Sequence, residues 1–192
     1  MPVRLFLAGA ALMVLAAPAL AHPALDGRTD GFVGGVAHPL LGLDHVAAMI
    51  AIGLWAAVLG RKATRQVPVA FVAAMVGGFL LAASGGSLPG VEPGIAASVL
   101  ILGLLIAAAV RLPLAASMGL AGLFAVFHGH AHGSETSGNA LAIGLGLGTS
   151  TILLLAAGLW VGTSLAQRRP PFARGLGAAI AGFGLVLVGG LA

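Results

Sequence analysis

Two short stretches hold most of the side chains in this sequence that could do chemistry. The first contributes His38, Asp44 and His45, and the second contributes His128, His132 and Glu135. Imidazole nitrogens and carboxylate oxygens together suit nickel, zinc, cobalt and copper(II) ions. Cysteine is absent from the chain, which excludes a thiolate metal site. These residue types predict a pathway or site for a divalent transition metal.

The spacing within the second stretch indicates which of its histidines are the stronger candidates for metal ligands. His128, His132 and Glu135 follow an i, i+4, i+7 pattern, which puts them on one face of a continuous helix. His130 would point to a different face and is a weaker candidate. His22 is also weaker, because it would start the mature chain and could only capture metal outside the membrane.

Two other roles are open to the same residues. They could be buried polar groups that hydrogen-bond helices together, or proton carriers in a relay. Both stretches, however, lie in sequence that is otherwise almost wholly apolar. A charged side chain at the centre of a bilayer costs roughly 2.5–3.5 kcal/mol on insertion scales and usually marks function. So many ionisable groups together therefore favour the metal pathway.

The composition predicts an all-α integral membrane protein. Of the 192 residues, 59% are hydrophobic and only 7% are charged, whereas soluble domains carry about 25% charged residues. The lipid bilayer is thus the expected environment, and a homo-oligomer is compatible with it. There is no GxxxxGK[ST] phosphate-binding motif and no basic run with interleaved aromatics. We therefore expect neither ATP nor nucleic acid as a partner.

Residues 1–21 have the pattern of a cleaved signal peptide. Arg4 supplies a positive charge, a short apolar run follows, and Ala19-Leu20-Ala21 is a small-x-small cleavage site. An uncleaved first helix is the alternative, but polar residues follow the site at once. We therefore expect residues 22–192 to form one transmembrane domain.

The mature chain is expected to form a bundle of six membrane-spanning helices. A spanning helix needs about 20 apolar residues, and the apolar runs cover residues 32–60, 67–83, 95–111, 113–132, 140–166 and 173–191. Pro39 lacks a backbone donor and disfavours helical geometry at His38. We therefore expect the first segment to enter the membrane as an irregular or re-entrant stretch, with its regular helix beginning near Pro39 or later.

Basic residues predict the orientation of this bundle. Apart from Arg28, those of the mature chain follow segments one, three and five: Arg61, Lys62, Arg65, Arg111, Arg168, Arg169 and Arg174. The positive-inside rule places these connections in the cytoplasm and both termini in the periplasm, across a bacterial inner membrane. His45 precedes Gly60 by 15 residues and His128 follows Pro113 by 15. Both lie roughly 22 Å from the cytoplasmic boundary at 1.5 Å per residue, so the two stretches should meet.

The sequences HPLLGLDHVAAM and FHGHAHGSE resemble the two signature motifs of the HupE/UreJ family of small membrane proteins. The family pattern is a histidine, five residues and Asp-His in the first mature helix, and FHGxAHGxE in the fourth. The resemblance extends to the signal peptide, the six helices and the chain length. It implies that the metal pathway consists of His38, Asp44, His45, His128, His132 and Glu135, whereas His130 occupies a variable position.

The family is associated with nickel hydrogenases and ureases, and its members are regarded as nickel permeases. The resemblance therefore implies a permease, not an enzyme, that transports Ni²⁺ for hydrogenase or urease maturation and holds no tightly bound cofactor. The ligand types alone also allow Co²⁺, Zn²⁺ or Cu²⁺. Two rival functions stay open. One is an intramembrane metalloenzyme in which three protein ligands hold a catalytic zinc, and the other is a metal-sensing or assembly accessory protein.

Overall fold

The computed structural model describes residues 31–135, 138–168 and 170–191, and all regular secondary structure within these ranges is helical. The helices are α2 (Gly31–Leu41), α3 (Leu43–Leu59), α4 (Ala63–Ala83), α5 (Val91–Ala107), α6 (Leu114–Ser134), α7 (Ala140–Arg168) and α8 (Pro170–Gly189). The all-α expectation is confirmed for this part of the chain. The expected signal peptide and His22 lie outside the described residues.

Several of these helices are long and apolar enough to cross a membrane. Four qualify by length and composition, namely α4, α6, α7 and α8. The pair α2 and α3 qualifies together, although it is bent by 83°, and would make a fifth span. Helix α5 is apolar but has only 17 residues. The chain thus has the helices of a multi-pass membrane protein, and the count of six spans stays a prediction.

The first segment does not enter as an irregular stretch, but the 83° bend between α2 and α3 is compatible with the other expectation, a re-entrant stretch. Its beginning is helical, and Pro39 is buried inside α2. The break falls instead at Gly42, whose backbone is extended with φ −91° and ψ 107°. Helix α2 ends at Leu41, two residues after Pro39. The longer helix α3 begins at Leu43, which agrees with the expectation of a regular helix from near Pro39 or later, although the shorter helix α2 precedes it.

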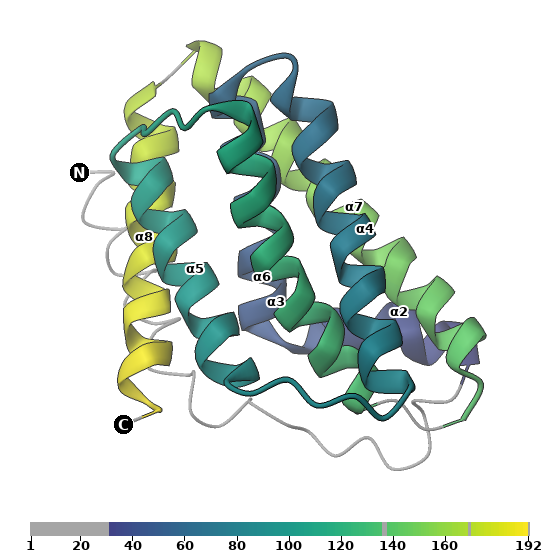
Figure 1. The fold of residues 1–192 in the computed structure, drawn as a ribbon. Helices are drawn as coiled ribbons and strands as arrows, with labels where there is room; N and C mark the ends of the chain where they lie inside the picture. Colours follow the sequence, from purple (N-terminus) through teal and green to yellow (C-terminus); the bar gives the residue numbers. More distant parts are fainter. Residues whose placement is uncertain (1–30, 136–137, 169, 192) are drawn as a thin grey trace.

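The helices form a bundle with α2 lying across one end, at a steep angle to the others (Figure 1). Helix α4 packs most extensively on α6, α5 on α8, and α7 on both α2 and α3. The α3–α4 and α5–α6 connections and the start of α8 lie at the opposite end, at the top of Figure 1. The basic side chains Arg61, Lys62 and Arg111 belong to these connections. Positive charge therefore gathers at one end of the bundle, and α2 lies at the other.

Glycines allow the tightest helix pair, α4 with α6, to approach closely. A Cβ atom added to Gly129 would collide with the carbonyl group of Met75, and one added to Gly78 would collide with the carbonyl of Val126. Small residues at such contacts let the backbones of membrane helices come together. Because Gly129 faces α4, the neighbouring residue His128 is turned by about 100° around α6, toward α3 and α5.

Replacing Gly129 with alanine should therefore destabilise the protein by about 1–3 kcal/mol, the usual cost of overpacking. Gly119→Ala is the matched control, because Gly119 lies on the same helix and an added Cβ would meet nothing within 4 Å. Alanine is also the better helix former, so the control should be neutral or slightly stabilising. Thermal unfolding of the two purified variants in detergent checks this, and equal midpoints would contradict the assigned packing.

Candidate functional site

The two chemically active stretches meet at the end of the bundle where α2 turns into α3. The ring centroid of His45 lies 4.8 Å from that of His128 and 4.5 Å from that of His132. The His38 ring lies 5.2 Å from the His132 ring. The prediction that the two stretches approach each other is confirmed. The side chains of His38, Asp44, His45, His128, His132 and Glu135 are called the cluster below.

One face of α6 supplies the second half of the cluster. The helix continues through both glycines of the second stretch to Ser134, and Glu135 is its C-cap residue. His128 and His132 both contact His45, which confirms the shared face that their spacing predicts. The carboxylate of Glu135 lies further out, where its Oε2 atom is 2.8 Å from Nε2 of His38. This contact ties the end of α6 to α2.

Asp44 orients the imidazole ring of His45. Its Oδ1 atom accepts hydrogen bonds from the backbone N–H of His45 at 2.7 Å and from Nδ1 of the same residue at 2.8 Å. Because a carboxylate only accepts hydrogen bonds, Nδ1 carries the proton and Nε2 keeps its lone pair. That Nε2 atom is buried and has no hydrogen-bond partner among the described residues. A carboxylate that orients a histidine in this way is typical of metal ligands.

Burial increases step by step through the cluster. The side chains of Glu135 and His38 are 43% and 31% exposed, and that of His45 is 13% exposed. His132 is 2% exposed and His128 is completely buried. Donor groups therefore lead from the surface of this end of the bundle into its interior, each within reach of the next.

The cluster is not a closed metal cage. Among the described residues, no three histidine or carboxylate side chains are arranged so that they could hold one ion. The His45 and His128 rings meet edge to face at 90°, as a T-shaped pair. An ion passing here would bind fewer than three of these side chains at a time, or its binding would move the side chains closer together.

His130 lies apart from the cluster. Its Nε2 atom donates to the carbonyl oxygen of Gly86 at 3.0 Å, in the connection between α4 and α5. This position agrees with the prediction that His130 points to another face of the helix. Its structural role is to fasten that connection to α6.

Two neighbours of His128 escaped the sequence analysis. The hydroxyl of Ser98 on α5 lies 3.0 Å from Nε2 of His128, and the Phe71 ring of α4 lies 6.2 Å from the His128 ring, centroid to centroid. A serine within the apolar helix α5 is a weak signal by itself. Its partner on α6 could not be identified, because sequence spacing relates residues only within one helix.

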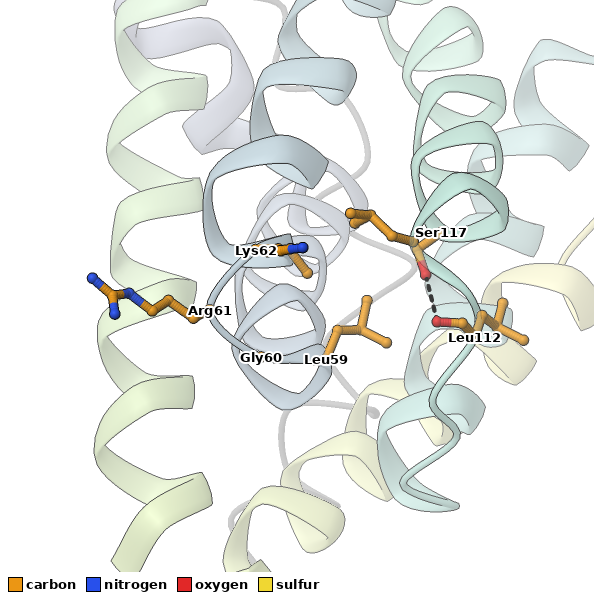
Figure 2. A pocket seen from close by; sticks show the side chains of 8 residues that line it. Leu59, Gly60, Arg61, Lys62, Leu112 and Ser117 are labelled. Atoms are coloured by element: carbon orange, nitrogen blue, oxygen red, sulfur yellow. Dashed lines mark hydrogen bonds between the residues drawn. The ribbon is translucent and has the colours of Figure 1, made fainter.

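A cavity of about 380 Å³ lies at the opposite end of the bundle. It is lined by Leu59–Ala63, Leu112, Leu114 and Ser117, and in Figure 2 the Arg61 side chain extends away from Leu112 and Ser117. No member of the cluster lines it. Along α3, the fully buried side chains of Met49, Ile52 and Trp55 separate this cavity from His45. Packed core side chains of α3 therefore lie between the cluster and the end that carries the basic connections.

Comparison with known proteins places this geometry in context. The family described as HupE / UreJ protein matches residues 10–187 of the chain. The protein named "Protein HupE" of Rhizobium leguminosarum bv. viciae is 43% identical over 150 residues, which cover 77% of this chain and 78% of that protein. No protein of solved structure matches the chain at a significant level.

Proposed function

We infer the function from two premises: the chain belongs to the HupE/UreJ family, and the buried histidines His128 and His132 both contact His45 in one cluster. We propose that the protein is a permease that moves a divalent transition metal into the cytoplasm, with nickel as its substrate for hydrogenase or urease maturation. The observation that carries the proposal is the increase in burial from Glu135 and His38 to His128. It describes a series of ligands, which suits an ion in transit better than a resident cofactor.

The chemistry of the donors supports transport of a cation. Imidazole nitrogens and carboxylate oxygens bind nickel and its neighbours in the transition series. Binding needs neutral imidazoles and ionised carboxylates, so it should weaken in acid. Because the donors do not converge on one point, the expected affinity is modest, and the ion keeps part of its hydration shell.

The orientation of the protein in a bacterial inner membrane is part of the proposal. The basic connections lie at the end of the bundle opposite α2 (Figure 1), and the positive-inside rule would put that end in the cytoplasm. The cluster would then lie near the periplasmic face, where the metal enters. Release into the cytoplasm requires the packed core around Met49 and Trp55 to rearrange, as in the rocking of helices around a fixed site in other transporters.

Nickel uptake into vesicles that contain only this purified protein tests the proposal. We expect uptake of trace nickel above that of protein-free vesicles, and competition by cobalt. No ATP is needed, because the chain has no ATP-binding motif. An intramembrane metalloenzyme would instead retain one tightly bound zinc ion and transport nothing. Vesicles that bind nickel on the surface without accumulating it would contradict the permease and favour a sensor or accessory role.

A further inference from the structure

We infer that Ser98 is a positioning residue that sets the tautomer of His128, so that Nδ1 of His128 presents its lone pair to the metal. The inference rests on the proposed function for the identity of the ligand, but its basis is a separate set of contacts. Ser98 lies on α5, outside both signature stretches, and is completely buried. Its hydroxyl oxygen lies 2.6 Å from the carbonyl oxygen of Ile95 and 3.0 Å from Nε2 of His128.

The position of the protons follows from these two distances. Two oxygen atoms 2.6 Å apart need a hydrogen between them, and only the Ser98 hydroxyl can supply it to the Ile95 carbonyl. A serine hydroxyl has one hydrogen and two acceptor lone pairs. It can therefore only accept from His128, whose Nε2 must carry the proton. The other ring nitrogen of the neutral imidazole, Nδ1, is then unprotonated.

This assignment explains an otherwise costly feature of the cluster. Nδ1 of His128 is buried and has no hydrogen-bond partner among the described residues. Native proteins rarely leave a buried polar atom unsatisfied without a reason. The adjacent His45 shows the same pattern. Its Nδ1 carries a proton that is donated to Asp44, and its buried Nε2 is unprotonated and has no hydrogen-bond partner among the described residues. Two neighbouring rings thus keep one lone pair each, and each lone pair is a donor that a divalent cation could bind as it passes.

The two rings are held by different partners in opposite tautomers. The Asp44 carboxylate accepts from Nδ1 of His45 and so keeps the proton on that nitrogen. The neutral Ser98 hydroxyl accepts from Nε2 of His128 and keeps the proton there. Without the Ser98 hydroxyl, the Nε2–H group of His128 would be buried with no acceptor. Neither ring nitrogen would then have an acceptor for the proton, so the tautomer would no longer be fixed and Nδ1 would no longer reliably keep the lone pair that we assign to the metal. Outer partners of this kind typically change metal affinity or activity by about 10- to 100-fold.

The first test measures the tautomer directly in the purified, metal-free protein. ¹⁵N NMR of labelled histidine distinguishes protonated from bare ring nitrogens, and the His128 signals are identified by their loss in His128→Ala. We expect wild-type His128 to be protonated on Nε2 and Ser98→Ala to lose this preference. Ser98→Thr keeps a hydroxyl and should restore it. A wild-type His128 protonated on Nδ1 would overturn the inference.

Ser150→Ala is the matched control. Ser150 on α7 is 1% exposed, and its hydroxyl also donates to the carbonyl three residues earlier, that of Leu147, at 3.1 Å. It therefore reports the cost of removing a buried hydroxyl that contacts no histidine. We expect Ser150→Ala to leave the His128 signals unchanged. If Ser150→Ala changes them as much as Ser98→Ala does, the effect is a general one on the bundle and the inference is overturned.

The second test measures metal binding with Co²⁺ as a spectroscopic probe. We expect Ser98→Ala to weaken Co²⁺ binding about 10-fold, with Ser150→Ala unchanged and Ser98→Thr closer to wild type. Wild-type affinity in Ser98→Ala would overturn the inference. Failure of the proposed function gives a different result: vesicles with wild-type protein would not accumulate nickel, while the ¹⁵N and Co²⁺ measurements would still decide the role of Ser98.

Discussion

Replacing His128 with alanine should reduce the uptake of trace nickel on the order of 100-fold. Mutating a residue that only hydrogen-bonds a metal ligand already lowers metal affinity or activity by about 10- to 100-fold, so loss of the ligand itself should reach at least the upper value. His128 is the innermost donor of the cluster, completely buried and in contact with His45. Its removal would leave the metal no ligand at the inner end of the series. The measurement is the initial rate of nickel uptake into vesicles at a metal concentration far below saturation.

His130→Ala is the matched comparison, because it removes a second buried histidine only two residues away on the same helix. His130 is 8% exposed and contacts the Gly86 carbonyl, not the cluster. We expect it to lower the stability of the protein, because the α4–α5 connection loses a hydrogen bond, while uptake by the folded protein falls much less than in His128→Ala. Equal losses of uptake in the two folded variants would show that the cluster has been assigned to the wrong face of α6.

Asp44→Asn should reduce the uptake of trace nickel by about 10- to 100-fold. The carboxylate holds the proton of His45 on Nδ1 and supplies the negative charge nearest to that ring. Asparagine nearly keeps the size of the side chain but removes the charge that offsets an incoming dication. Its amide can also donate, so the tautomer of His45 is no longer enforced. The dependence of the uptake rate on nickel concentration should show a weaker apparent affinity.

Asp44→Glu provides the complementary test, because it keeps the charge and changes only the reach. We expect it to retain more uptake than Asp44→Asn, even though the contact with His45 is less well placed. If Asp44→Asn transports trace nickel like the wild type, the role of Asp44 is limited to accepting the backbone N–H of His45 in the first turn of α3, and the proposed pathway loses one of its members. Unfolding measured on the same preparations separates this outcome from simple loss of protein.

The identity of the chemically active residues could be read from the sequence. Ionisable side chains are so rare in an apolar chain that their positions alone select them. The one-face relation of His128 and His132 was also predictable, since it depends only on the period of the helix. The meeting of His45 with His128 was predictable because charge at the connections relates the depths of two helices, and their ring contact confirms it.

Other features were decided by contacts between helices, which sequence spacing does not encode. Ser98 and His128 lie on different helices, so their hydrogen bond depends on how α5 rotates and slides against α6. The same holds for the bond between His130 and Gly86. These partners determine which ring nitrogen keeps its lone pair and which histidine stays outside the cluster.

The bend of the first segment also depended on the tertiary structure. Pro39 indicated a break, but the chain is helical through Pro39 and turns by 83° at Gly42. The packing of α2 against α7 gives the physical reason. A Cβ atom added to Gly35 would collide with the carbonyl of Ile143, so the two backbones are in close contact and α2 is held in place as a helix. The sequence therefore determined which side chains could bind a metal, and the packing of helices determined how their donor atoms are presented.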